Sequence, residues 1–321
     1  MAGFIVRRLL GGLLLLVVVS AVTFVIFTVF PSTDPALLRA GRQPTQEIIA
    51  QIRIDLGLDK PYLTQFVDYV TGVFTQFDLG RSYVSGRRPV ADEIFDNLPA
   101  TLWLTAGAVV LWLTVGLSIG ILAAVRHRSI FDRLSIGLSL IAVSAPVYWL
   151  GLVSLYLFAP EGGALGVEFL GGQGAYQIGQ PIGERIQALV LPWCVLAASF
   201  AAVYSRLMRG SLLEVMGEDY IRTARAKGVS EGRVILRHGV RSAVTPVVTV
   251  LGLDIGILLG GAILTETVFN VPGVGRLAFD AISRGDLPII QGTVLVGAFF
   301  IVILNLLVDV LYAYLDPRVR N

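Results

Sequence analysis

Six long apolar stretches dominate the hydrophobic pattern of this chain. Each contains roughly 20 or more mainly apolar residues, the length that a helix needs to cross the hydrocarbon core of a bilayer. Lipid satisfies no backbone hydrogen bonds and six isolated strands close no barrel, so the stretches are expected to be helices. The pattern predicts an all-α integral membrane protein with about six transmembrane helices, at about 9–30, 99–125, 134–158, 186–208, 244–269 and 289–315.

The composition agrees with a membrane location and excludes several classes of site. Only 15% of the 321 residues are charged, whereas soluble domains have about 25%. The formal net charge of +2 gives no sign of a nucleic-acid partner. Cys194 is the single cysteine, so the sequence offers neither an internal disulfide framework nor a Cys-rich metal site. We expect no metal, no cofactor and no nucleic acid.

The first apolar stretch could be mistaken for a signal peptide. It is longer than the roughly 7–15 apolar residues of such a peptide, and no clear Ala-x-Ala cleavage site follows it. We interpret 1–30 as an uncleaved N-terminal transmembrane helix. The next segment, 31–98, is too long for a plain connection and too small for an enzyme domain, so a small extracytoplasmic subdomain is expected. Its apolar spacing predicts helices at 45–56, with Gly57 as the stop, and at 61–77.

The distribution of basic residues orients the chain in the membrane. Cytoplasmic segments carry an excess of Lys and Arg, counted over short loops. With the N-terminus inside, the inner side receives arginines at both ends of the chain and a basic group at 206–241. Both termini are therefore expected in the cytoplasm, and the even number of helices agrees. The other inner residues are Arg7, Arg8, Arg126, Arg128, Arg133, Arg318 and Arg320, and the short outer loops have only Arg185, Arg276 and Arg284.

The cytoplasmic segment 209–244 has the most distinctive pattern. Glu218 and Asp219 are suited to the start of a helix, whose positive end they complement. Good helix formers follow at 220–227, with cations near their end, and Gly228 is a natural stop. The pattern predicts a short helix that ends in a glycine turn.

A second short helix is expected at 231–238, with Ser230 as its N-cap and Gly239 as its end. Two short helices joined by an elbow would then lie across the inner surface. They could rest on anionic lipid as a basic amphipathic element, or dock into a groove on another protein. Because 221–228 contains no Trp, Phe or Leu to enter lipid, docking is the favoured interpretation.

Several motifs, in order along the chain, resemble those of a known family. Arg222-Thr-Ala-x-x-x-Gly228, continued by His238, Arg241 and Pro246, resembles the EAA loop of binding-protein-dependent ABC importer permeases. Arg222 stands where the general consensus has its name-giving Glu. Over essentially its whole length the chain resembles the B-type permease subunit of the dipeptide/oligopeptide/nickel importers. The other motifs that carry this resemblance are Asp55-Leu-Gly-Leu-Asp-Lys-Pro61, Phe77-Asp-Leu-Gly-Arg-Ser82, Thr265-Glu-Thr-Val-Phe-Asn-Val-Pro-Gly-Val-Gly275 and Leu307-Val-Asp-Val-Leu-Tyr-Ala-Tyr-Leu-Asp-Pro-Arg318.

The resemblance implies a type I ABC importer permease fold, with a five-helix core at 99–321. A coupling helix at 219–237 would dock on a cytoplasmic ATPase. Implied partners are a second homologous permease, expected to be a different chain, two P-loop ATPase subunits, an extracytoplasmic peptide-binding protein and the lipid of a bacterial inner membrane. Peptides would cross as the permease alternates between outward- and inward-facing states. The ATPase-coupling residues that the resemblance implies are Tyr220, Arg222, Thr223, Ala224, Lys227, Gly228 and Arg233.

The sequence has no nucleotide-binding motif of its own. The G-x-x-x-x-G-K-[ST] phosphate loop is absent, and the only lysines, Lys60 and Lys227, stand in other contexts. The chain is therefore not expected to be an enzyme. Its energy would come from a gradient or from a partner.

Polar side chains inside the predicted helices need an explanation, because a carboxylate at mid-bilayer costs roughly 2.5–3.5 kcal/mol. Asp254, Asn305 and Asp309 are candidates for the translocation path, and the alternative is pairing between helices. The two interpretations are even for Asp254, whereas pairing is favoured for Asp309, near the cytoplasmic end.

Two groups of residues near the end of the fifth predicted helix are candidates for gating and assembly. Glu266 is expected to order the exit loop at 269–275 and so to form a gate. Small residues spaced about four apart allow close helix approach, most simply against the partner permease. The gate candidates besides Glu266 are Asn270, Pro272, Gly273 and Gly275, and the small residues are Gly252, Gly256, Gly260 and Gly261.

Two other functions are weighed against the importer permease. A secondary carrier would need ion-coupling groups and commonly has broken helices at the midplane; Asp254 could serve, but the basic loop would have no purpose. An intramembrane hydrolase would need a nucleophile and base buried together, whereas the only histidines, His127 and His238, fall in predicted cytoplasmic loops. Nickel is a possible substrate in place of peptide, but no His or Cys pair lies in the membrane to carry it.

Overall fold

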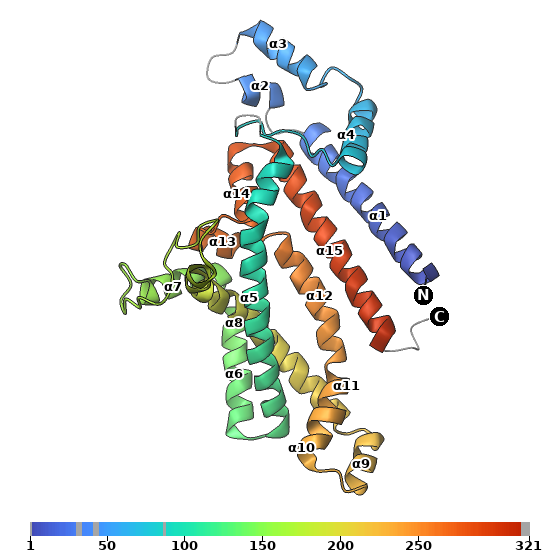
Figure 1. Cartoon of the computed structure of the whole chain (residues 1–321), viewed down its shortest axis with the longest axis vertical. Helices are drawn as coiled ribbons and strands as arrows, with labels where there is room; N and C mark the ends of the chain where they lie inside the picture. The colour runs from blue at the N-terminus through green and yellow to red at the C-terminus, as the bar shows by residue number, and fades with distance from the viewer. Residues whose placement is uncertain (1, 30–33, 41–44, 86–87, 316–321) are drawn as a thin grey trace. The chain divides into compact units, whose positions relative to one another are not determined.

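The computed structural model describes residues 2–29, 34–40, 45–85 and 88–315. Within these residues the regular structure is helical, apart from one isolated bridge between Arg81 and Pro89 (Figure 1). The chain divides into two compact units. Unit 1 contains 1–101, 256–266 and 272–321, and unit 2 contains 102–255 and 267–271.

Unit 1 is built on two long helices that lie side by side, α1 (Ala2–Phe24) and α15 (Leu287–Leu315) (Figure 1). Gly12 permits this approach, because a Cβ at that position would lie 2.5 Å from the Val302 side chain. At its end α1 continues as a π-helical turn, η1 (Val25–Val29).

A compact apolar core joins three further parts of unit 1. The first residues of α5 (Val90–Val125) and the buried face of α14 (Val274–Arg284) pack against the beginning of α15. Removing this apolar surface from water or lipid headgroups stabilises the corner. The buried members of this core are Val90, Ile94, Val274, Ala281, Leu287, Ile289 and Ile290.

The segment after α1 forms the two helices that the sequence predicts, together with a shorter one before them. Thr45 is an N-cap whose hydroxyl oxygen accepts from the Ile48 N–H at 3.3 Å. Gly57 follows with a φ of +65°, as expected of a stop. The three helices are α2 (Pro35–Ala40), α3 (Gln46–Asp55) and α4 (Tyr62–Gln76).

Aromatic rings attach α4 to the end of α1. The Phe24 ring lies edge-on to Phe66, with 5.4 Å between centroids, and stacks on Tyr69 at 6.2 Å. Burial raises the pKa of Tyr69 to about 12, so its phenol stays protonated. The outer segment and α1 both belong to unit 1.

Unit 2 is organised around α8 (Ile182–Val215). Two shorter helices, α6 (Ile130–Ser144) and α7 (Val147–Phe158), pack along it. The part of α5 that belongs to unit 2 packs closely against α8 at two glycines. A Cβ at Gly116 would lie 2.9 Å from the Ala201 carbonyl oxygen, and one at Gly120 would lie 2.5 Å from that of Ser205. Larger residues at these two positions would push the helices apart.

The prediction of about six spans is confirmed with a qualification. Among the described residues, four helices are long and apolar enough to cross a membrane. Up to six spans result if each of two bent pairs, Ile130–Ser144 with Val147–Phe158 and Glu231–Ala243 with Thr245–Leu259, counts as one. The unbroken candidates are Val6–Val29, Val90–Val125, Ile182–Val215 and Leu287–Val310.

Two predicted helices are broken where the sequence analysis expected continuous ones. The third bends by 100° between α6 and α7, because Pro146 has no N–H and holds Ala145 in an extended conformation. The fifth is interrupted after α12 (Thr245–Leu259), where Gly261 has a φ of +124°. The chain then forms the short α13 (Ile263–Phe269) and α14, a helix that the sequence analysis did not predict.

Candidate functional site

The predicted coupling loop folds as short helices joined by an elbow. Ile221 before the elbow and Val234 after it are fully buried. The loop contacts α8 through η2 and α11, and α9 packs against η2. The elements are α9 (Asp219–Ala226), α10 (Glu231–Arg233), the π-helical η2 (Val234–Val240) and α11 (Arg241–Ala243).

Gly228 ends α9, as the sequence predicts. Its φ is +77°, and its N–H donates to the Arg225 carbonyl at 2.9 Å. Across the elbow, the Arg225 guanidinium donates two hydrogen bonds to the Glu231 carboxylate, at 3.0 and 2.7 Å. This two-pronged ion pair is exposed, so it adds orientation more than stability. The sequence analysis missed it, although opposite charges on either side of a predicted elbow were a usable signal.

Three details of the loop differ from the sequence predictions. Glu218 and Ser230 occupy N-cap positions, but neither side chain makes a capping hydrogen bond. Gly239 does not end the second helix, which continues through η2 into α11. Its role is close approach to α8, since a Cβ there would lie 3.0 Å from Leu212 and 3.1 Å from the Met216 sulfur.

The side chains of α9 point away from the molecule at most positions. The Arg222 side chain is 73% exposed and pairs only with the neighbouring Asp219, at 3.3 Å. The Tyr220 hydroxyl donates to the Ser242 hydroxyl oxygen at 3.0 Å or accepts from it. Apart from Ile221 and the half-buried Ala224, the residues of α9 are therefore exposed, and most of them are polar. Of the other predicted coupling residues, Thr223, Lys227, Gly228 and Arg233 are exposed, and Ala224 is half-buried.

Asp254, in α12, has a partner inside unit 2. The buried Tyr204 hydroxyl donates to its carboxylate at 2.8 Å. Tyr204 is itself held by Trp112, whose ring centroid lies 5.9 Å away. The Asp254 side chain remains half-exposed, so hydrogen bonding to α8 and contact with a solvated path are compatible.

Asp309, in α15, pairs with the first helix of unit 1. Its carboxylate lies 3.0 Å from the Arg8 guanidinium. The two residues line a cavity of about 220 Å³ together with Asn305. This ion pair between helices is what the packing interpretation of Asp309 requires. Asp254 belongs to unit 2, so it has a different set of partners.

Two of the fifth-helix glycines make their close approaches inside the chain. A Cβ at Gly256 would lie 3.0 Å from the Ile301 Cα, and one at Gly260 would lie 3.1 Å from the Gly297 Cα. The expectation that these faces meet a partner permease is therefore wrong for Gly256 and Gly260. They pack against α15, because unit 1 folds this part of the chain back onto its own last helix.

Glu266 is a fully buried carboxylate at the predicted exit loop. Oε1 accepts from the Thr101 hydroxyl at 2.8 Å, and Oε2 accepts from the Arg276 N–H at 2.8 Å. The glycines of the loop leave room for it, since a Cβ at Gly273 would lie 2.3 Å from the Glu266 carboxyl carbon and one at Gly275 would lie 3.0 Å from Oε2. A side chain at Gly273 would displace the carboxylate.

The rest of the exit loop is shaped by backbone conformation. Asn270, in unit 2, has a φ of +56° directly after α13. The Phe269 carbonyl accepts from the Gly174 N–H at 2.8 Å, which attaches the glycine-rich outer loop to the end of α13. Pro272 is half-buried in unit 1.

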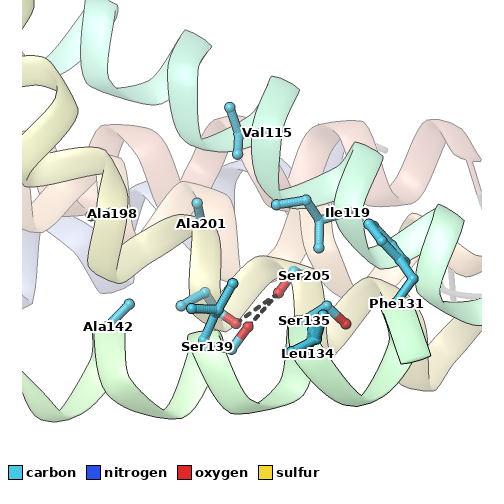
Figure 2. A pocket seen from close by; sticks show the side chains of 12 residues that line it. Val115, Ile119, Phe131, Leu134, Ser135, Ser139, Ala142, Ala198, Ala201 and Ser205 are labelled. Carbon is cyan, nitrogen blue, oxygen red and sulfur yellow. Dashed lines mark hydrogen bonds between the residues drawn. The ribbon is translucent and has the colours of Figure 1, made fainter. Parts of the chain in front are cut away.

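An apolar cavity of about 360 Å³ lies between α5, α6 and α8. Figure 2 shows Ser139 and Ser205 pointing toward each other across it, with 3.1 Å between their hydroxyl oxygens. Small and aliphatic side chains form most of the remaining lining, including Ala142, Ala198 and Ala201. The cavity has no charged lining residue, so it offers no site for the charged ends of a peptide.

A buried ion pair that the sequence analysis did not predict joins α6 to α8. The Arg209 guanidinium donates to both oxygens of Asp132, at 2.6 and 2.9 Å, and Asp132 is only 3% exposed. The Arg128 N–H donates to the same carboxylate at 2.9 Å. Charge-assisted bonds in this bidentate geometry hold α8 to α6 at Arg209, where the segment 209–244 begins.

Comparisons with known proteins give one consistent result. A family model described as "Binding-protein-dependent transport system inner membrane component" matches residues 116–321, and a model of the N-terminal part of such membrane components matches residues 1–105. The glutathione transport system permease proteins GsiC of Escherichia coli (strain K12) and Salmonella typhimurium are each 42% identical to this chain over 320 residues. The match covers 100% of this chain and 99% of each relative. Within the described residues, no group of three or more His, Cys, Asp or Glu side chains could hold a metal ion.

Proposed function

From the premise that the chain belongs to the binding-protein-dependent transport system inner membrane component family, and is thus an ABC importer permease subunit without ATPase activity of its own, we propose that it carries short peptides. The support is the kind of substrate named for its relatives, since glutathione is a tripeptide. The proposed substrate class is therefore di- to oligopeptides. A binding protein outside and ATPase subunits inside follow from the family itself.

The coupling helix is proposed to be α9 together with the elbow and α10, within 219–237. The observation that carries this proposal is the contrast between one buried anchor, Ile221, and an exposed polar face that includes Arg222 and Arg233. Anchoring on one side lets a push from an ATPase pass to α8 and α12 and not be absorbed by the loop. The Arg225–Glu231 pair keeps the elbow in shape during that push.

The assembly is proposed to contain a second, different permease and two P-loop ATPase subunits. Both termini are proposed to lie in the cytoplasm, on the basis of the positive-inside rule. Two of the arginines that support this orientation, Arg318 and Arg320, lie outside the described residues.

Asp254 is the strongest candidate for a residue of the translocation path, because its carboxylate is half-exposed while one bond to Tyr204 fixes it. Asn305 and Asp309 are weaker candidates, since Asp309 is already paired with Arg8. The proposed gate contains Glu266, Pro272, Gly273 and Gly275, which all belong to unit 1. Asn270, the other exit-loop candidate, belongs to unit 2.

The function can be tested by purifying the chain by affinity from its native membrane in mild detergent. Mass spectrometry should find a second permease and one or two P-loop ATPases in the same particle. ATPase activity of the particle should rise when a binding protein loaded with a peptide is added. Recovery of the chain alone, with uptake driven by a proton gradient, would replace the proposal with the secondary-carrier alternative.

A further inference from the structure

Asp286 is a buried carboxylate that the function described so far does not use. It is 1% exposed and lies between α14 and α15. Its two oxygens accept hydrogen bonds from the Ser82 hydroxyl, from the Tyr83 N–H at 3.0 Å and from the Val84 N–H at 3.3 Å. One side chain at a helix corner therefore holds three successive residues of the outer segment.

The serine that bonds Asp286 also bonds the backbone of the outer segment. The Ser82 oxygen, besides donating to Asp286, accepts from the Val84 N–H at 3.1 Å and the Ser85 N–H at 2.7 Å. A carboxylate surrounded by N–H and O–H donors in a buried site makes strong, directional bonds. We call Ser82, Tyr83, Val84 and Asp286 the outer latch.

The latch lies at the C-terminal end of α14. Gly285 closes this helix with a φ of +70°, and the Asp286 N–H donates back to the Ala281 carbonyl at 2.9 Å. The Asp286 carbonyl in turn accepts from the Ile290 N–H at 3.1 Å, which begins α15. The backbone of Asp286 is thus fixed by two helices while its side chain reaches the outer segment.

The N-terminal end of the same helix is held by Glu266. The first N–H groups of a helix lack partners within it, and Gly273 at the N-cap position has no side chain to supply one. The Val274 N–H donates to the Thr101 oxygen at 2.9 Å, and the Arg276 N–H donates to the Glu266 carboxylate at 2.8 Å. A carboxylate near the positive end of a helix is favourably placed.

Between these two ends, α14 is packed and not free to bend. Val274 and Ala281 belong to the buried core that joins α14 to the starts of α5 and α15. The N-terminal end of this eleven-residue helix is hydrogen-bonded to a buried carboxylate, and its C-terminal end is hydrogen-bonded to the Asp286 backbone N–H. With one face also in a core, the helix moves as a rigid body.

We propose that Asp286 is a positioning residue for transport, which makes α14 a strut between the outer latch and the gate carboxylate Glu266. A displacement of residues 82–85 on the extracytoplasmic side would move α14, and α14 would move Glu266 and the glycine break that precedes α13. This inference rests on the proposed function, since the displacement comes from the loaded binding protein. It assigns the outer segment a role in signalling substrate delivery to the broken fifth span.

The test uses the full complex reconstituted in proteoliposomes, with its own binding protein loaded with glutathione. Asp286→Asn removes the charge and two acceptor positions of the latch. ATPase activity without binding protein should stay within about 2-fold of wild type, whereas the stimulated increment should fall at least about 5-fold, which corresponds to about 1 kcal/mol of lost coupling at 1.4 kcal/mol per factor of ten.

The matched control is Asp280→Asn, which makes the same change on an exposed turn of α14. It should leave both activities as in wild type. Ser82→Thr keeps the hydroxyl and should retain stimulation, whereas Ser82→Ala should lose it. The double variant Ser82→Ala with Asp286→Asn should be no worse than Asp286→Asn alone, because both changes break one link.

Each result decides between the possibilities. Full stimulation of Asp286→Asn, or a parallel loss of basal and stimulated activity, would overturn the strut while the wild-type response still supports the proposed function. A wild-type complex that no peptide-loaded binding protein stimulates would overturn both. If Asp286→Asn does not assemble, the Ser82→Ala and Ser82→Thr pair gives the same decision, since both retain the carboxylate.

Discussion

Polar groups are exposed in one region of the molecule and buried in another. The first region is the coupling loop at 209–244, and the second is the outer corner formed by α13, α14 and the outer latch. In the loop, Arg222 and its neighbours are exposed and bond mainly to each other. At the corner, Glu266 and Asp286 are fully or almost fully buried and accept every bond from inside the chain. Both regions had been singled out by motif, but only the first leaves its polar groups available to a partner.

The difference shows what each region contributes. Exposed ion pairs add about 0–1 kcal/mol, so the loop can be altered without unfolding the protein, and changes there should alter coupling. A buried donor or acceptor that loses its partner costs about 1–3 kcal/mol, so changes at the corner should affect folding as well as function. Stability and coupling are therefore expected to separate between the two regions.

The largest effect on stability is expected at the corner, from Glu266→Ala. The Thr101 hydroxyl and the Arg276 N–H would each lose a buried acceptor, at about 1–3 kcal/mol apiece. Thermal melting followed by size-exclusion chromatography in detergent should show a clear drop. Glu266→Gln, which keeps one acceptor oxygen, should lose less. An unchanged melting temperature for Glu266→Ala would contradict the corner's structural role.

The largest effect on coupling is expected at the elbow, from Gly228→Pro. Proline fixes φ near −65° where the chain has +77°, and it removes the N–H that bonds Arg225. The chain should still insert and melt normally, while uptake and stimulated ATPase activity are lost. Gly228→Ala is the control, because no atom lies within 4 Å of the added methyl and the left-handed conformation costs about 1–2 kcal/mol. Normal uptake by Gly228→Pro would sink the assignment of the coupling helix.

A smaller effect on assembly is expected from Arg222→Glu. It reverses one exposed charge on the face proposed to meet the ATPase, so copurification of the ATPase should weaken, more so at low ionic strength. Arg133→Glu makes the same reversal on an exposed residue of α6 and should have no effect. Equal recovery of ATPase with both variants would contradict the contact.

The smallest effect is expected at Asp254, whose exposure lies between that of the coupling loop and that of the buried corner. Tyr204→Phe removes the 2.8 Å hydrogen bond and Asp254→Asn weakens it, a loss of about 1 kcal/mol or less. If the carboxylate faces the path, Asp254→Asn alone should change the apparent affinity for peptide in uptake assays. Equal kinetics for both variants would instead assign Asp254 to packing.

Sequence reasoning was strongest where local chemistry decides conformation. Gly228 and Gly57 were predicted as stops and have positive φ, and Thr45 caps α3. Sequence reasoning failed for Gly239. A glycine is needed there because α8 lies close to it, and not because the chain turns there. Gly256 and Gly260 were assigned to a partner permease for a similar reason. Their spacing shows that one helix face carries small residues, but it does not show which helix packs against that face.

By itself the sequence determined that the chain spans the membrane in about six helices and that it has no phosphate loop of its own, and it predicted that the loop at 209–244 docks on a partner. Hydropathy, motif absence and local turn chemistry are properties of neighbouring residues, so they can be read from the order of residues alone. The tertiary structure decided that Glu266 accepts from the start of α14, that Asp286 accepts from the outer segment and that Asp309 pairs with Arg8. Those partners are separated by ten to several hundred positions, and only folding brings a buried carboxylate to the donors that satisfy it.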